Sequence, residues 1–149
     1  MKKIASFTVN HDTLTEGIYV SRIDGDVTTY DLRTRVPNMG DYMDNLTMHS
    51  VEHMLATHLR NGELADKIIY FGPMGCQTGF YLLVRDAENE SVLSALISAL
   101  EQTLTSPAMY GQSRIECGNF ANLSLDAAKV ECLRYLNVLK SKDNDFQYK

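Results

Sequence analysis

The segment 49–53 reads H-S-V-E-H and places two histidines and a glutamate within little more than one helical turn. If the segment is helical, His49 and His53 lie about 40° apart around the axis, so both imidazoles can reach one ion. Glu52 lies about 60° from His49, in the same sector. This H-x-x-E-H spacing is typical of sites in which two imidazoles bind a divalent metal and the carboxylate transfers protons. His58 lies about 180° from His49 and cannot join the group.

A catalytic metal site usually has three protein ligands and one open position. The candidates for the third ligand are Cys117, Cys76, His11 and an aspartate or glutamate. Cys117 lies in a segment without helical or strand periodicity, and Cys76 lies in the glycine-containing segment 72–79, which leaves its side chain accessible. Cys132 falls on the apolar stripe of the last expected helix, which predicts a buried core residue.

Length and composition restrict the possible classes of protein. The chain has 149 residues and a mass of 16.8 kDa, which favours one domain over residues 1–149. Its net charge is −5 without a basic run, so we expect no nucleic-acid partner and no anionic membrane partner. No apolar stretch approaches the roughly 20 residues that cross a bilayer. Three widely spaced cysteines are a poor disulfide framework and predict a cytoplasmic protein.

The periodicity of the chain predicts the elements that must position these residues. The second of the expected strands carries Arg33 and Arg35 on one face, because strand side chains repeat every two residues. The order of the elements predicts an α+β fold with an antiparallel sheet packed with helices. Extended segments are expected at 18–20, 27–36, 67–71 and 80–85, and helices at 44–60, 88–105 and 124–139, followed by a polar tail at 140–149.

Three motifs together resemble a known family. They are H-S-V-E-H at 49–53, G-P-M-G-C-Q-T-G-F-Y at 72–81 and E-C-G at 116–118. With His11 and the segment 31–33, they cover nearly the whole chain and look like the LuxS family of S-ribosylhomocysteine lyases. None of these motifs would be specific alone, but the combination is.

The resemblance implies a LuxS/metallohydrolase-like enzyme of one domain that forms a homodimer, with active sites at the interface. The implied reaction cleaves the thioether of S-ribosyl-L-homocysteine to L-homocysteine and 4,5-dihydroxy-2,3-pentanedione, the precursor of autoinducer-2. Such an enzyme serves quorum sensing and homocysteine metabolism. The resemblance also implies one divalent metal per subunit, Fe²⁺ in the native family and often Zn²⁺ or Co²⁺ in preparations.

By the same resemblance, His49, His53 and Cys117 would bind the metal, and Cys76 and Glu52 would be the catalytic acid/base pair. The reaction moves the sugar carbonyl inward from C1 to C3 and then eliminates the thiolate. Each move takes a proton from one carbon and returns it to the next. A thiol and a carboxylate suit this proton transfer.

The resemblance further implies that Ser6, His11 and Arg33 contact substrate, with the N-terminal segment reaching across the dimer. Two positions depart from many relatives. Relatives often have Asp where this chain has Tyr70, and Ser where it has Gly72. The Tyr70 position is therefore not carried over as a substrate contact.

Two other functions remain open on residue chemistry alone. Inverted H-x-x-E-H motifs also occur in zinc metallopeptidases, in which the glutamate activates a zinc-bound water. A peptidase needs an extended substrate-binding cleft, for which 149 residues leave little room. A non-catalytic structural zinc module would instead be closed by four ligands, with Cys76 as the fourth.

Overall fold

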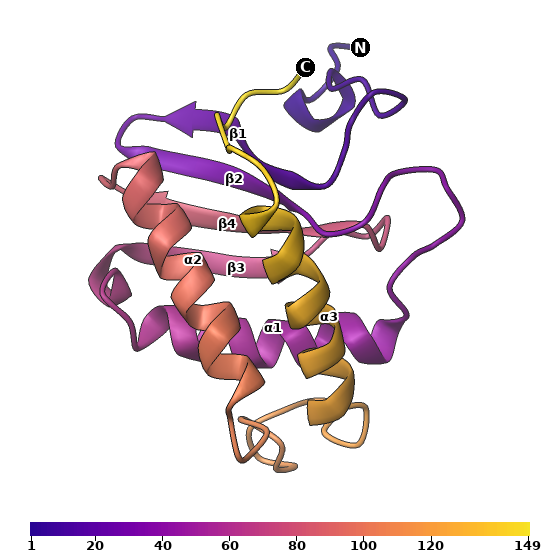
Figure 1. Ribbon diagram of the computed structural model, residues 1–149, viewed down its shortest axis with the longest axis vertical. Helices are drawn as coiled ribbons and strands as arrows, with labels where there is room; N and C mark the ends of the chain where they lie inside the picture. Colours follow the sequence, from indigo (N-terminus) through magenta and orange to yellow (C-terminus); the bar gives the residue numbers. More distant parts are fainter.

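A four-stranded antiparallel sheet with the order β1-β2-β4-β3 forms the centre of the molecule, in a computed structural model that describes residues 1–149. Figure 1 shows α2 and α3 crossing one face of this sheet, while α1 runs beside β3. The predicted α+β fold is therefore confirmed. The elements are β1 (Gly17–Asp24), β2 (Val27–Arg33), α1 (Asn45–Arg60), β3 (Ile68–Pro73), β4 (Gly79–Arg85), α2 (Asn89–Leu104) and α3 (Leu125–Lys140), with short 3-10 turns at Ala5–Phe7 and Ala65–Lys67.

The two faces of the sheet have different roles. Tyr30 and Leu32 of β2 are fully buried in the hydrophobic core beneath the helices. Because successive strand residues point to opposite faces, Asp31 and Arg33 lie on the face away from the helices. Tyr81 of β4 is the register partner of Asp31 and lies on that same face. The strand alternation thus separates the apolar core from a face that carries charged groups.

The side chains of α1 that could bind a metal or transfer protons lie beside its buried apolar stripe. Asp44 caps its first turn, because its side chain accepts a hydrogen bond from the Thr47 backbone N–H at 2.8 Å. His49, Glu52 and His53 are half-buried beside the stripe, as a partly core-facing helix requires. The stripe consists of Met48, Val51, Met54, Leu55 and Leu59, all buried. None of the three helices has the length and apolar character that a membrane-spanning helix needs.

The second strand is shorter than the predicted segment 27–36. It ends at Arg33, and the chain then turns toward the helices. Arg35 donates from Nε to Glu131 of α3 at 2.8 Å, whereas Arg33 stays on the other face of the sheet. The predicted common face of Arg33 and Arg35 is therefore wrong, because the alternation stops where the strand does.

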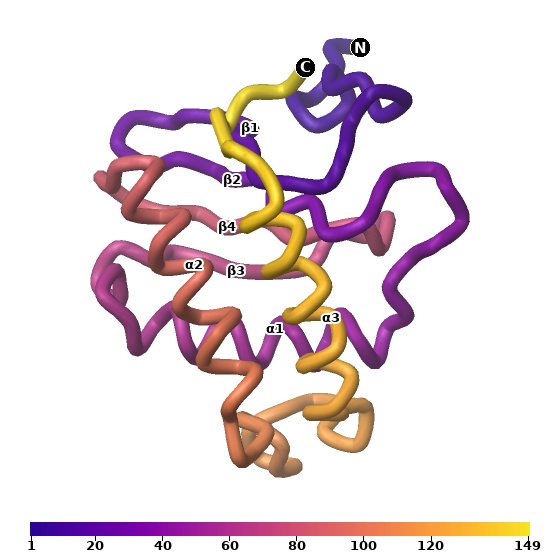
Figure 2. Tube along the Cα trace, in the orientation of Figure 1, coloured from indigo at the N-terminus to yellow at the C-terminus, as the bar shows by residue number.

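The last ten residues, predicted to be a polar tail, dock against the sheet. Phe146 is 5 % exposed, and its carbonyl accepts a hydrogen bond from the Val20 backbone N–H at 2.8 Å. Tyr148 stacks on Tyr19 of β1, with ring centroids 5.1 Å apart. Figure 2 shows this segment running from the end of α3 past β1 to end near the N-terminus, and one parallel bridge joins Phe146 to Tyr19 of β1. The aromatic residues, not the lysines and aspartates around them, decide its position.

Candidate metal centre and active site

His49, His53 and Cys117 come together in the structure. One ligand atom from each lies within 4.8 Å of the others, and His49 Nε2 is 3.4 Å from Cys117 Sγ. The helix supplies the two imidazoles one turn apart, and the segment between α2 and α3 supplies the thiol. Of the candidates for a third ligand, Cys117 is the one that the fold places here. Two imidazoles and a thiolate fit one divalent metal ion such as zinc or iron.

Both imidazoles are held by backbone carbonyls. His49 Nδ1 donates to the Asn122 carbonyl at 2.8 Å, and His53 Nδ1 donates to the Tyr110 carbonyl at 2.8 Å. A carbonyl can only accept, so each Nδ1 carries the proton and each Nε2 lone pair is free to bind a metal. This pattern is the usual support for metal-binding histidines. It strengthens the case that the cluster is a metal site.

The segment between α2 and α3 lies close against the imidazoles. Gly111 has a φ of +65°, and a Cβ there would lie 3.0 Å from His53 Nδ1. Only glycine combines this conformation with so close an approach. The Asn119 backbone N–H donates to Cys117 Sγ at 3.4 Å, which helps to fix the position of the sulfur. His58 stays outside the cluster, as predicted: it packs against Tyr110, and burial lowers its pKa.

Glu52 lines a cleft of about 250 Å³ that opens beside the cluster. Its walls are His49 and Glu52 from α1, Pro73 at the end of β3, and Asn119 and Asn122 from the segment before α3. The cleft therefore joins the candidate metal ligands to the start of the turn that carries Cys76. A carboxylate in this place can exchange protons with a small molecule bound there.

Cys76 is exposed on the turn between β3 and β4. The turn is closed by the Met74 backbone N–H, which donates to the Gly79 carbonyl at 2.9 Å. Gln77 adopts a φ of +66°, unusual for a residue other than glycine, and is held there by two hydrogen bonds to the Met43 backbone. The thiol of Cys76 is therefore accessible, and the hydrogen bonds of the turn fix its position.

A buried ion pair lies behind Cys76. Arg33 Nη2 donates to Asp31 Oδ2 at 2.6 Å, and both side chains are almost fully buried. Arg33 Nη1 donates to Thr78 Oγ1 at 2.8 Å and lies 3.9 Å from Cys76 Sγ. Thr78 Oγ1 is itself 3.0 Å from Cys76 Sγ, and its own proton remains free to be donated to the sulfur. A positive charge and a hydroxyl both face the thiol.

The charge of Arg33 is secured by its partner. Burial opposes the charged form, but the hydrogen bonds and the charge of Asp31 outweigh it, so the pKa of Arg33 is raised. The register partners of Arg33 are Gly17 on β1 and Gly79 on β4. A Cβ at Gly79 would collide with the Leu32 carbonyl, so this position needs glycine. Arg33 therefore has no side chain directly opposite it on either neighbouring strand.

Ser6 and His11 lie apart from the metal-ligand cluster. Ser6 lines a hollow of about 530 Å³ on the face of the sheet away from the helices, with Tyr70 and Tyr81. His11 Nδ1 donates to the Val9 carbonyl at 2.9 Å. Neither residue hydrogen-bonds to a predicted catalytic or metal-binding side chain within one chain. Their predicted role as substrate contacts stays a prediction.

Tyr70 explains the glycine two residues later. A Cβ at Gly72 would overlap the phenol ring of Tyr70, which is 53 % exposed. A side chain at position 72 would therefore require the half-exposed ring of Tyr70 to move.

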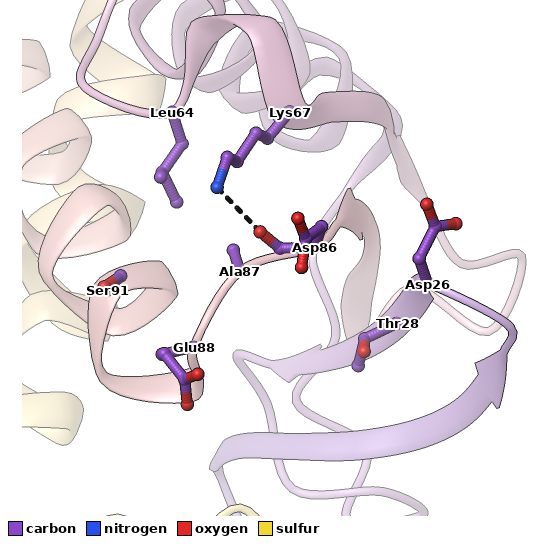
Figure 3. A pocket seen from close by; sticks show the side chains of 8 residues that line it. All are labelled: Asp26, Thr28, Leu64, Lys67, Asp86, Ala87, Glu88 and Ser91. Carbon is purple, nitrogen blue, oxygen red and sulfur yellow. Dashed lines mark hydrogen bonds between the residues drawn. The ribbon is translucent and has the colours of Figure 1, made fainter.

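A second hollow, of about 420 Å³, lies at the opposite end of β4 from the Cys76 turn. Figure 3 shows Lys67, whose Nζ donates to the Asp86 backbone carbonyl at 2.7 Å. Asp26 and Glu88 also line it, but none of the residues with a predicted role does.

Cys132 is buried on α3, as predicted, and burial raises its pKa to about 12. An unfolded cysteine ionises near pH 8.5, so the folded thiol keeps a proton that the unfolded one loses. The buried thiol therefore makes its full contribution to the free energy of unfolding below about pH 8.5. Between about pH 8.5 and 12 this contribution falls by roughly 1.4 kcal/mol per pH unit. Urea unfolding at pH 8 and pH 10 should therefore show a smaller loss of stability for Cys132→Ala than for the wild type. Equal losses would contradict this assignment.

The sequence reasoning missed Asp31, Thr78 and Tyr148, all of which belong to the network around Arg33. Asp31 could have been found, because it lies two residues before Arg33 and so shares its strand face. Thr78 lies in the recognised turn motif. Nothing in the sequence pattern pointed to Tyr148.

The fold and the cluster define a small α+β protein with a candidate His-His-Cys metal centre and an exposed thiol at Cys76. The family model described as S-Ribosylhomocysteinase (LuxS) matches residues 4–146, and the chain belongs to this family. A protein named S-ribosylhomocysteine lyase from Borreliella afzelii (strain PKo) is 44% identical over 156 residues, covering 99% of each chain. One of the same name from Finegoldia magna (strain ATCC 29328) is 45% identical and covers 95% of this chain and 94% of its own.

The two alternative functions are not favoured. The cleft beside the cluster, of about 250 Å³, offers no groove for an extended peptide. Cys76 contacts Arg33 and Thr78 and is not a member of the ligand cluster, so a four-ligand structural zinc site lacks its fourth ligand.

Proposed function

We propose that the chain is a metal-dependent carbon–sulfur lyase that cleaves S-ribosyl-L-homocysteine to L-homocysteine and 4,5-dihydroxy-2,3-pentanedione. The observation that carries the proposal is the convergence of His49, His53 and Cys117 beside a small cleft that Glu52 lines. The relatives named S-ribosylhomocysteine lyase, which match nearly the whole chain, support the choice of substrate.

His49, His53 and Cys117 would hold one divalent metal per subunit. The bound metal supplies Lewis acidity at the sugar oxygens, where negative charge develops. We assign Fe²⁺ as the native metal, with Zn²⁺ or Co²⁺ able to replace it, because a mixed imidazole and thiolate set suits these ions. The carbonyls of Asn122 and Tyr110 support this assignment, since they leave both Nε2 atoms free.

Cys76 and Glu52 would move the protons. The sugar carbonyl must migrate from C1 to C3, and each shift removes a proton from one carbon and returns it to the next. Cys76 suits the carbon-bound protons, because its sulfur is exposed and faces the guanidinium of Arg33 and the hydroxyl of Thr78. Glu52 would transfer protons between sugar oxygens and take the proton whose loss triggers elimination of the homocysteine thiolate.

Glu52→Gln should keep the fold and the bound metal but release homocysteine at least about 100-fold more slowly, because the amide cannot accept the proton. Circular dichroism and metal analysis give the first two quantities, and a thiol-reagent assay gives the third. Glu63→Gln is the matched control, because it makes the same substitution at an exposed glutamate outside the cleft. Wild-type turnover in Glu52→Gln would remove Glu52 from the mechanism.

We assign Ser6, His11 and Arg33 to substrate binding in a homodimer whose active sites lie at the interface. Ser6 lies far from the ligand cluster in its own chain, which supports a contribution to the partner's site. The hollow that it lines is bordered by exposed Ile4 and Tyr70, the kind of surface that a second copy covers. Light scattering should give twice the chain mass of 16.8 kDa. A monomeric mass would refute the shared site.

In this proposal residues 1–149 form one catalytic domain that works in the cytoplasm. The reducing environment there protects a reactive thiol beside an oxidisable metal. The product would feed autoinducer-2 synthesis, and the reaction also returns homocysteine to methionine metabolism.

The decisive experiment incubates the anaerobically purified protein with S-ribosylhomocysteine and a thiol reagent, after loading with Fe²⁺, Co²⁺ or Zn²⁺ in separate samples. We expect homocysteine release with at least one metal, and loss of activity in air that follows loss of Fe²⁺. No release with any of the three metals would refute the lyase.

A further inference from the structure

The C-terminal residues contact the ion pair that faces Cys76. Tyr148 Oη donates to Asp31 Oδ2 at 2.7 Å, the same oxygen that accepts from Arg33 Nη2 at 2.6 Å. Asp31 and Arg33 are 1 % and 2 % exposed, although they lie on the sheet face away from the helices. A chain of direct contacts therefore runs from the end of the polypeptide through Asp31 and Arg33 to the sulfur of Cys76.

The hydroxyl of Tyr148 can act only as a donor in this contact. Burial and the neighbouring charge of Asp31 raise the pKa of Tyr148, so the phenol stays protonated. Its hydrogen bond spreads part of the negative charge of Asp31 away from Arg33. It also gives a buried carboxylate oxygen a hydrogen-bond donor that a water molecule would otherwise have to supply.

Three contacts hold the phenol in place. Its ring stacks on Tyr19, the Phe146 carbonyl accepts from the Val20 backbone N–H, and the Phe146 side chain packs against Tyr30 with ring centroids 6.4 Å apart. The aromatic anchor lies two residues before Tyr148, so the hydroxyl is presented to Asp31 by a fixed segment.

We infer that Tyr148 is a positioning residue for Cys76, acting through Asp31 and Arg33. This inference rests on the proposed role of Cys76 in the lyase reaction. The hydroxyl of Tyr148 holds Asp31 in the orientation that makes two hydrogen bonds to Arg33, and so holds Nη1 toward Thr78 and the thiol. Without the hydroxyl, the carboxylate is freer to rotate and its undiminished charge draws the guanidinium away from Cys76. Both changes weaken the contact between Arg33 Nη1 and the sulfur of Cys76.

The test compares Tyr148→Phe with Tyr19→Phe. Each removes one hydroxyl from the same stacked ring pair, but the Tyr19 hydroxyl contacts Thr15 rather than Asp31. The full-length metal-loaded variants are treated with iodoacetamide at pH 7, and alkylation of Cys76 is followed by peptide mass spectrometry. We expect Tyr148→Phe to react about three- to tenfold more slowly at Cys76, the range that one net hydrogen bond supplies. Tyr19→Phe should match the wild type.

A second measurement separates positioning from a structural effect. Under the lyase assay, Tyr148→Phe should lower kcat by a similar factor, because Tyr148 acts on Cys76 through Asp31 and Arg33, whereas Tyr19→Phe should keep the wild-type kcat. Equal alkylation rates at Cys76 in Tyr148→Phe and the wild type would overturn the inference, as would an equal slowing in Tyr19→Phe.

The two proposals fail differently. If the wild type never releases homocysteine but Tyr148→Phe is still alkylated more slowly at Cys76, the lyase proposal is refuted and the role of Tyr148 is supported. Unchanged alkylation in an active lyase would refute the role of Tyr148 alone.

Discussion

Cys76→Ala is expected to abolish homocysteine release while the protein keeps its fold and its metal. The thiol lies on an exposed turn and contacts Arg33 and Thr78, so its removal leaves the ligand cluster of His49, His53 and Cys117 intact. A group that transfers protons typically contributes about 10²- to 10⁴-fold to the rate, and we expect a loss in that range. Metal content by plasma mass spectrometry and turnover by the thiol-reagent assay measure the two halves of the prediction.

Cys132→Ala is the matched control, because it also removes one thiol but from the buried core of α3. It should retain turnover at a moderate cost in stability. Loss of metal from Cys76→Ala would favour a closed structural zinc site with Cys76 as the fourth ligand. Normal turnover in this variant would exclude Cys76 from catalysis.

Cys117→Ala is expected to lose metal and activity together. Cys117 supplies the only thiolate of the ligand set, and its sulfur lies 3.4 Å from His49 Nε2. Since loss of a mere supporting contact already weakens metal binding about 10- to 100-fold, loss of a ligand should weaken it by more than about 100-fold. Dialysis against a chelator of known affinity, followed by metal analysis, gives the ratio.

Paired with Cys76→Ala, this variant distinguishes the two cysteines. Cys76→Ala should keep its metal but lose turnover, and Cys117→Ala should lose both. Supplying excess Fe²⁺ or Co²⁺ should restore part of the activity of Cys117→Ala, because His49 and His53 remain. Full metal content in Cys117→Ala at ordinary metal concentration would show that another residue is the third ligand.

Those parts of the site that depend on local geometry could be predicted from the sequence. The angles between His49, Glu52 and His53 around the axis follow from the geometry of a helix. The apolar stripe of α1 and its cap Asp44 indicate that helix in the sequence. The burial of Cys132 follows in the same way from its place on α3. Helical spacing is a short-range property, so no knowledge of the rest of the fold is needed.

Contacts between distant segments could not be predicted from such patterns. Spacing alone left Cys117 as one of several candidate ligands, since a segment without periodicity gives no direction to its side chain. The end of β2 at Arg33 depends on the pairing of Arg35 with Glu131, almost a hundred residues away in the sequence. The docking of the tail was missed because its composition is polar, whereas Phe146 and Tyr148 make its contacts with the sheet.

The segment between α2 and α3 does three things at once for the candidate metal centre. It supplies the sulfur of Cys117, and its Tyr110 and Asn122 carbonyls orient His53 and His49. Both helical imidazoles therefore depend on the same stretch of chain as the thiolate. The three ligands are thus not independent of one another, and a change in this one stretch of chain is expected to affect the geometry of all three.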